Sequence, residues 1–264
     1  MLKVGLLLVT TLILAAAAAA VLSRRADRPS PSPMAPVGTS SSCEARRFEG
    51  TRLTVCRFDA DRGQLALVQA DAAGRPYRTF DAVEQALGVG AARVRFAMNA
   101  GMFDAGGYPI GLFVQDGLER RGLNRREGPG NFHLLPNGVF AEDEAGQVHV
   151  VAAERFAAEV PDPRWATQSG PMLVIDGALH PRFDQDGVSR LIRNGVGVSD
   201  PKTAWFVISE EGISFGRFAR FFRDELGCAD ALFLDGTVSS LWDVPARRRD
   251  SHAELGPMLV VSGR

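Results

Sequence analysis

Glycine and proline divide this chain into short pieces, and this punctuation limits what it can fold into. The 264 residues include 28 Gly and 15 Pro, and 45% of all residues are hydrophobic. Short apolar runs bounded by Gly and Pro are typical of β-strands joined by turns. The pattern therefore favours many short strands over a helical bundle. The length suits one large globular domain, or two small ones, once any leader is removed.

The N-terminus has the pattern of a secretory signal peptide. A short basic start ends at Lys3, an apolar run extends from Val4 to Leu22, and small residues at 15–20 offer cleavage sites. This run of about 19 residues is also long enough to span a bilayer, so an uncleaved anchor is the alternative. We divide the chain into a signal peptide or anchor (1–22), a disordered linker rich in Pro, Ser and Arg (23–42) and a folded domain (43–264). The domain is expected in the periplasm or outside the cell, or N-terminally anchored and facing outward.

The net charge and the cysteine content limit which binding partners and which chemistry can be expected. The net charge of -1 gives no overall attraction to nucleic acid, and membrane contact is expected only through an uncleaved N-terminal segment. An oxidising compartment permits a disulfide. We expect it between Cys43 and Cys56, which would close a short loop at the start of the domain, while Cys228 is expected to be a small buried thiol. Because no C-x-x-C or Cys/His zinc spacing occurs, no metal site and no cofactor is assigned, and a divalent cation stays an open alternative.

Turn and cap signals place several elements along the chain. Hairpins are expected between 51–58 and 65–70, between 110–115 and 118–120 across Asp116-Gly117, and between 132–135 and 139–141 across Pro136-Asn-Gly138. Helices are expected over 81–87, with Asp81 and Glu84 as a capping box, over 153–160 and over 214–226, where Ser214 is the cap.

Four apolar runs begin or end at polar corners that contain glycine. The run Ala231–Leu234 stops at Asp235-Gly236, with Ser239 and Ser240 beyond it; the other corners are Asn99-Ala-Gly101, Gln168-Ser169-Gly-Pro171 and Arg193-Asn194-Gly195. Glycine lets backbone amides approach a ligand closely. Neutral Asn, Gln and Ser donors with one fixed Arg cation fit a sugar phosphate better than an apolar ligand. Taken alone, Asp235-Gly236 is more typical of a simple turn than of a functional site.

Arg193 and His133 can each be interpreted in two ways. Arg193 follows two apolar residues, so it is expected to be buried and to need a partner. That partner is either the phosphate or carboxylate of a ligand, which its fork would bind at two points, or an internal Asp. His133 lies beside a polar loop that ends at Asn131. It is either a general acid or, as we favour, a half-buried strand histidine.

Six segments, taken in order, resemble the phosphodiester glycosidase family, and most closely its bacterial exported branch. They are Ala97–Phe103, Pro109–Phe113, Gly130–Phe132 with Pro136–Gly138, Gln168–Pro171, Arg193–Gly197 and Leu234–Gly236 with Ser239 and Ser240. The resemblance extends from about Phe48 to Val261. It implies an α+β domain with a mixed, mostly antiparallel β-sheet and a few packed helices. It also implies hydrolysis of a sugar that is linked through a phosphodiester.

The resemblance and the residue chemistry together suggest roles for the corner residues. A carboxylate is useful for activating water or for stabilising an oxocarbenium-like transition state, and we expect Asp235 to supply it. Arg193 is expected to hold the phosphate, with Asn99 as the third catalytic residue. Substrate contacts are expected from Gly101, Asn131, His133, Gln168, Ser169, Asn194, Gly236, Ser239 and Ser240.

The sequence leaves two classes of function. The first is an exported hydrolase that cleaves a sugar from a glycosyl phosphodiester, either a glycan or a glycerophospho-sugar. The alternative is a non-catalytic envelope protein that binds glycans or phosphosugars through the same corners. A Ser-His-Asp hydrolase is disfavoured, because no G-x-S-x-G motif occurs.

Overall fold

The structure, a computed structural model, describes residues 42–264. The predicted signal peptide or anchor (1–22) and all but the last residue of the predicted linker (23–42) lie outside the described residues. Within residues 42–264, no helix has both the length and the apolar character needed to cross a membrane.

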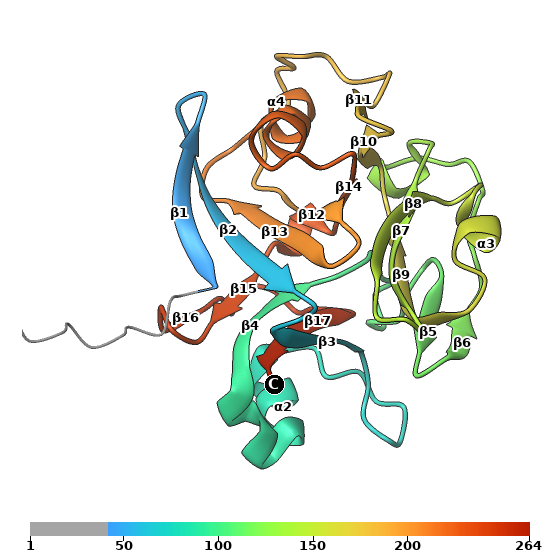
Figure 1. Cartoon of the computed structure of the whole chain (residues 1–264), viewed down its shortest axis with the longest axis vertical. Helices are drawn as coiled ribbons and strands as arrows, with labels where there is room; N and C mark the ends of the chain where they lie inside the picture. Colours follow the sequence, from blue (N-terminus) through green and yellow to red (C-terminus); the bar gives the residue numbers. More distant parts are fainter. Residues whose placement is uncertain (1–41) are drawn as a thin grey trace, which may run out of the picture. The chain divides into compact units, whose positions relative to one another are not determined.

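Three β-sheets form the framework of the described residues (Figure 1). The first sheet has the order β1 (Cys43–Phe48), β2 (Thr51–Asp59), β13 (Thr203–Ser209), β12 (Asn194–Asp200), β14 (Asp230–Phe233), β10 (Met172–Ile175) and β11 (Ala178–Leu179). The second has the order β16 (Arg248–Arg249), β15 (Leu241–Asp243), β4 (Val94–Asn99), β17 (Met258–Gly263) and β3 (Gly63–Val68). The third has the order β6 (Leu118–Arg121), β5 (Phe113–Gln115), β9 (Pro163–Ser169), β7 (Gly138–Asp143) and β8 (Val148–Ala152).

The helices are few and short, as the sequence predicts. They are α2 (Phe80–Leu87), α3 (Phe156–Glu159) and α4 (Phe215–Arg220), which continues as the π-helix η3 (Phe221–Glu225). Three 3-10 turns complete the set: η1 (Gly88–Arg93), η2 (Asn131–His133) and η4 (Gly236–Val238). Antiparallel sheets with a few packed helices make this an α+β fold, which confirms the predicted class.

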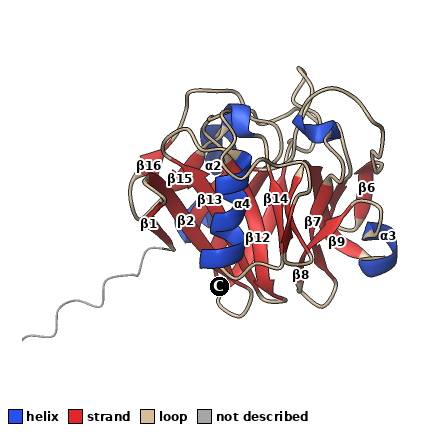
Figure 2. Cartoon of the chain, turned by 90° about the horizontal axis from the view of Figure 1, so that it is seen from above, coloured by secondary structure: helices blue, strands red, loops and turns tan. Residues whose placement is uncertain are grey.

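The core lies between the three sheets, and separate apolar layers cover their outer faces. Side chains from all three sheets meet in one cluster that includes Phe206, Phe96 and Phe140. On the other face of the first sheet, α4 and η3 pack over β12 and β13 (Figure 2). Gly195 and Gly197 allow this close approach, because a Cβ atom there would lie 3.2 Å from Phe218 and 2.6 Å from Phe222.

The structure corrects two of the three expected hairpins. β2 and β3 are consecutive, yet β2 pairs with β1 and β13 while β3 pairs with β17. Residues 132–135 form no strand, and β7 pairs with β8 and β9 instead. The hairpin across Asp116-Gly117 is confirmed, since both residues have the positive φ angles (53° and 72°) that such a tight turn requires.

Helix ends follow local capping chemistry, although not always at the expected residue. The Ser214 hydroxyl accepts a hydrogen bond from the Arg217 amide at the start of α4, as predicted. Helix α2 is capped by Thr79, whose hydroxyl accepts from the Ala82 amide, so the predicted Asp81 capping box is wrong. The predicted helix over 153–160 is reduced to the four residues of α3.

The predicted Cys43–Cys56 disulfide is confirmed. The two residues are direct partners in the antiparallel β1–β2 pair, with Cα atoms 3.9 Å apart. Cys228 is the buried free thiol that the sequence predicts, and burial raises its pKa to about 12. Such a thiol stays protonated and is a poor nucleophile.

Candidate functional site

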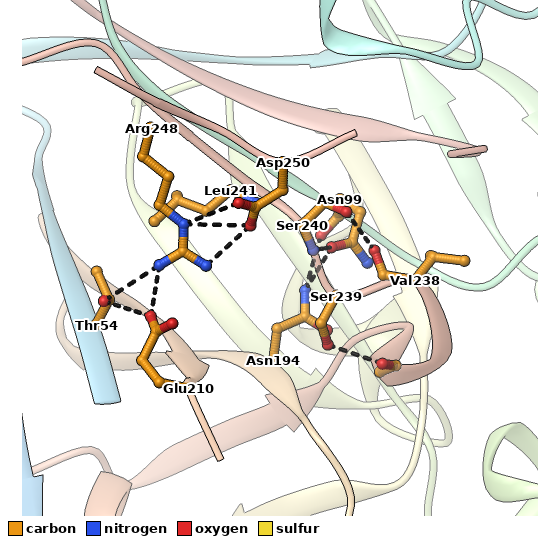
Figure 3. A network of polar contacts seen from close by, with 11 residues as sticks. Thr54, Asn99, Asn194, Glu210, Val238, Ser239, Ser240, Leu241, Arg248 and Asp250 are labelled. Carbon is orange, nitrogen blue, oxygen red and sulfur yellow. Dashed lines mark hydrogen bonds and ion pairs between the residues drawn. The ribbon is translucent and has the colours of Figure 1, made fainter. Parts of the chain in front are cut away.

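Asn99, the last residue of β4, joins the polar ends of four strands (Figure 3). Its carboxamide oxygen accepts hydrogen bonds from Asn194 Nδ2 (2.9 Å) and from the Ser240 amide (2.8 Å). Its Nδ2 donates to the Asp235 carbonyl oxygen at 2.9 Å. The Ser239 hydroxyl lies 3.3 Å from Asn194 Oδ1. Five residues predicted from separate motifs therefore form one connected cluster.

Antiparallel pairing explains why these ends meet. β12 pairs with β14 so that Gly195 lies opposite Phe233, and the Leu234 amide donates to the Asn194 carbonyl oxygen. Arg193 and Asp235 lie just beyond this pairing, directly before β12 and shortly after β14. The C-terminal end of one strand thus meets the N-terminal end of its neighbour. The second sheet contributes Asn99 and Ser240, which places the cluster where the first and second sheets adjoin.

Arg193 is buried without a carboxylate partner. Only 2% of the residue is exposed, and no Asp or Glu among residues 42–264 lies within ion-pair distance of it. Nε donates to the Ile213 carbonyl oxygen (2.8 Å) and Nη2 to that of Ser189 (3.4 Å). Nη1 makes no hydrogen bond in the described part of the chain and is not among the unpartnered atoms sealed from solvent. The ion pair with an internal Asp, one of the two predicted interpretations, is therefore not formed among the described residues.

Aromatic rings hold the guanidinium of Arg193 in place. Its Cζ lies 3.6 Å from the ring centre of Phe215 and 5.5 Å from that of Phe233. The Phe215 ring also stacks on Phe183, which in turn stacks on the buried His180. Cation–π contacts strengthen when they are removed from water. Burial lowers the pKa of Arg193 to about 10, so the group stays charged at neutral pH.

Asp235 is the second charge without a partner in this cluster. Its side chain is half-buried, and Oδ1 accepts from the Thr237 amide at 3.3 Å. Desolvation raises the pKa of this carboxyl, and the hydrogen bond from Thr237 opposes part of that effect. No cation among the described residues forms an ion pair with it. Opposite charges on neighbouring strands that do not neutralise each other are typical of a functional site.

A second group of predicted residues is built around Gln168. Its carboxamide accepts from the Leu112 and Asn124 amides (2.9 Å each) and donates to the Asn124 carbonyl oxygen (2.6 Å) and to Asn137 Oδ1 (3.2 Å). These four bonds use its full capacity, which gives Gln168 the geometry of a scaffold for the loop at 124. Its neighbour Ser169 is fully buried, and its hydroxyl has no hydrogen-bond partner.

Gly101 connects the two groups. A Cβ atom at this position would lie 2.3 Å from the Gln168 carbonyl oxygen and 2.6 Å from Thr167 Oγ1. The segment after Asn99 therefore lies against the end of β9, and only glycine fits there. Gly236 is restricted similarly, since its Cβ would lie 2.5 Å from the Phe233 ring.

Asn131 and His133 lie in the 3-10 turn η2, beside the second group. The side chain of Asn131 is exposed. His133 is half-buried in this turn and not in a strand, and its Nδ1 is 2.6 Å from the Arg126 carbonyl oxygen. Nδ1 must therefore carry the proton, and no printed contact joins either residue to Asn99 or Asp235.

Sequence reasoning missed the residues that brace the cluster. Arg248 donates to Asp250 through Nε and Nη2 and to Glu210 through Nη1 (Figure 3). Asp250 in turn accepts from the Leu241 amide at 3.0 Å, next to Ser240. Glu210 follows Ser209, which is bonded to Arg193 twice. The Ser209 hydroxyl accepts from the Arg193 amide (2.9 Å), and the Ser209 amide donates to the Arg193 carbonyl oxygen (2.8 Å). The Glu210–Arg248–Asp250 clamp therefore links the Arg193 side to the Ser240 side, and the run of arginines before Asp250 is its one trace in the sequence.

A cavity of about 360 Å³ lies elsewhere, between η1 and the β15–β16 turn. Arg248 lines it, together with Trp242, Arg247 and Arg249, but none of the predicted site residues does. We place the candidate site at the Asn99 cluster, because the residues predicted from separate motifs are hydrogen-bonded to one another there. No group of three or more His, Cys, Asp or Glu side chains suited to a metal ion occurs within residues 42–264.

Comparison with known proteins assigns the family. Residues 92–262 match the model of the phosphodiester glycosidase (NAGPA) family. The match covers more than half of the chain and includes every predicted site residue from Asn99 to Ser240. The chain therefore belongs to the phosphodiester glycosidase family.

The chain is also similar to proteins of known sequence or structure. The uncharacterized protein YigE of Escherichia coli K12 is 37% identical over 152 residues, which are 57% of this chain and 58% of YigE. The auto-inhibited catalytic domain of zebrafish N-acetylglucosamine-1-phosphodiester alpha-N-acetylglucosaminidase superposes with a TM-score of 0.58 and 13% identity, over 90% of this chain and 87% of that one. A hypothetical protein from Synechocystis gives a TM-score of 0.52 and 14% identity over 84% and 61%. At these identities the two structures establish the fold alone.

Proposed function

We propose that this protein hydrolyses a glycosyl phosphodiester, with water attacking the anomeric carbon of the sugar and a phosphomonoester leaving. The observation that supports this proposal is a buried cation, Arg193, and a half-buried carboxyl, Asp235, at the ends of the paired strands β12 and β14, with no ion pair between them. A substrate with an anionic phosphate next to a sugar carbon complements both. Family membership supports the same class of reaction.

Asp235 is proposed to act on the water. Its raised pKa makes it a stronger base than an exposed carboxylate, and the hydrogen bond from Thr237 orients one oxygen and leaves the other for the water proton. The water oxygen bonds to the anomeric carbon, Asp235 takes the proton, and the bond from that carbon to the phosphate oxygen breaks. The phosphate takes the bonding electrons as a stable anion, so no general acid is needed at the leaving group.

Arg193 is proposed to hold the phosphate through Nη1. The aromatic rings and the two carbonyl oxygens fix its guanidinium, so little order is lost when the phosphate binds. Asn99 is proposed to position Asp235, whose carbonyl oxygen it holds, because Asn99 is buried and its carboxamide oxygen is already bonded to Asn194 and Ser240. The substrate contacts proposed for Gly236, Ser239, Ser240 and the Gln168 group stay predictions.

We also propose that the domain works outside the cytoplasm. A disulfide in its first strand pair is typical of an oxidising compartment, and the apolar N-terminus has the pattern of an export signal.

The proposal is tested with a chromogenic sugar phosphodiester and the Asp235→Asn variant. We expect turnover by the native protein and a loss of at least about a thousandfold in the variant, because a carboxamide cannot accept the proton. Circular dichroism of both proteins checks that the variant is folded. Full activity in the folded variant removes Asp235 from the mechanism, and tight binding without turnover by the native protein favours the non-catalytic alternative.

A further inference from the structure

The segment that leads into Arg193 presents large apolar side chains to solvent. Val188 is 97% exposed, Leu191 59% and Ile192 48%. Burying such a side chain is favourable by about 1.5–3 kcal/mol, so a folded domain seldom leaves several together in water. No other stretch of five residues within 42–264 exposes three of them.

This apolar segment (residues 188–192) is anchored to the candidate site and is not a free loop tip. Leu191 forms an antiparallel bridge with Ile213, and the Ser189 carbonyl oxygen accepts from Arg193 Nη2. On the other side, the Ile192 carbonyl oxygen lies 3.3 Å from the Cβ position of Gly236. The segment therefore borders both Arg193 and the Asp235-Gly236 turn.

Cationic side chains accompany the apolar ones. Arg182 and Arg190 are exposed, and neither guanidinium makes an ion pair or hydrogen bond within the described residues. Of the two carboxylates in the same loop, Asp186 pairs with Arg217 and Arg220, while Asp184 is exposed. Apolar groups next to unpaired cations complement a ligand that joins an anionic phosphate to a hydrocarbon.

We propose that the apolar segment binds the aglycone, and that this aglycone is an alkyl or acyl chain, so that the substrate is a sugar linked through phosphate to a lipid-like alcohol. The inference rests on the proposed function. A phosphate held at Arg193 carries the sugar on one ester arm and the aglycone on the other. The residues that follow Arg193 in β12 are buried as far as Gly197, whereas the preceding residues 188–192 carry exposed side chains along which the second arm can extend.

The test compares two substrates with the same sugar phosphate, one esterified to decanol and one to glycerol, both below micellar concentration. We expect the native protein to prefer the decyl substrate by about tenfold or more in kcat/KM, since several methylenes would contact the segment. The ratio of the two kcat/KM values should fall at least about threefold in Leu191→Ser and in Ile192→Ser. The matched control is Val89→Ser, which removes an equally exposed (98%) side chain on η1 and should keep the native ratio.

The outcomes separate the two proposals. Turnover of both substrates at similar kcat/KM, or a preference that both serine variants retain, overturns the lipid aglycone and leaves the hydrolase intact. No turnover of either substrate by the native protein overturns both. Because all three variants change exposed side chains, loss of folding is not expected, and a thermal melt verifies it.

Discussion

At the scale of single residues, the candidate site is made of groups that the fold holds at a cost. A carboxyl such as Asp235, buried without a cation, is less stable ionised than it would be in the unfolded chain. An arginine buried among aromatic rings with no carboxylate is a similar case. Natural proteins retain such groups where function requires them.

Asp235→Asn is therefore expected to raise the melting temperature at pH 7. The pKa of Asp235 in the folded protein lies above the unfolded value of about 3.9, so protonation of this carboxyl stabilises the folded state at low pH. That contribution is fully present below the unfolded pKa and is lost as the pH rises through the folded pKa. The amide carries no charge and keeps the oxygen that accepts from Thr237.

Thermal melts of both proteins from pH 3 to pH 8 measure this difference. The stability gap should be largest above the folded pKa and should close toward pH 3. An aspartate protein that is the more stable of the two at pH 7 would show that a partner compensates the buried charge.

Residue types at the site were predictable, but their roles were not. Asn99, Asn194, Ser239, Ser240 and the Asp235 backbone, predicted from separate motifs, meet in one hydrogen-bonded cluster. Gln168 was expected to contact substrate, yet its four hydrogen-bond positions are used by Leu112, Asn124 and Asn137. These hydrogen-bond partners lie more than thirty residues away in sequence. Such contacts form only when the whole chain folds, so no local pattern specifies them.

At the scale of elements, Gly101 sets how closely the end of β4 approaches β9. Gly101→Ala should destabilise the fold by about 1–3 kcal/mol, because its methyl group would overlap the Gln168 carbonyl oxygen and Thr167. The control is Gly90→Ala, where nothing lies within 4 Å of the new methyl group. Urea unfolding measures both. Equal stability of the two variants would mean that β4 and β9 can separate without loss.

The Glu210–Arg248–Asp250 clamp should matter for activity as well as stability. Arg248→Met keeps the length of the side chain and leaves two half-buried carboxylates without their cation, at a cost of about 1–3 kcal/mol. The control is Arg46→Met, which breaks the exposed pair with Glu44 and should cost under about 1 kcal/mol.

Kinetics distinguish positioning from mere stabilisation. At a temperature where both variants are folded, kcat of Arg248→Met should fall about tenfold, because the Leu241 amide and with it Ser240 lose their anchor. If Arg248→Met is less stable but keeps the native kcat, the clamp only stabilises the fold and does not position the site.

Local sequence signals predict some turns and helix caps, but they do not predict which strands pair. Asp116-Gly117 and Ser214 acted as their sequence predicts. The expected pairing of residues 51–58 with 65–70 is wrong, because proximity along the chain predicts a hairpin, whereas the two strands belong to different sheets. In this fold β3 instead pairs with β17, the last strand of the molecule. Pairing over such a separation depends on the complete core.

At the scale of the whole domain, the predicted class holds and the topology explains the site. Every pairing among the named strands is antiparallel, so polar residues at the end of one strand meet those at the start of the next. Asn99 ends its strand and Asp235 follows its strand, whereas Arg193 and Ser240 precede theirs. A parallel sheet would have gathered only the residues at strand ends.

The central claim is that the sugar carbon, and not the phosphorus, is the atom attacked. Hydrolysis in ¹⁸O-enriched water followed by ³¹P NMR of the released phosphomonoester tests it directly. The account predicts that the phosphate acquires no ¹⁸O, because water bonds to the anomeric carbon and the phosphate keeps its four original oxygens. An ¹⁸O isotope shift on the phosphomonoester signal would instead show attack at phosphorus and would contradict the roles given to Asp235 and Arg193.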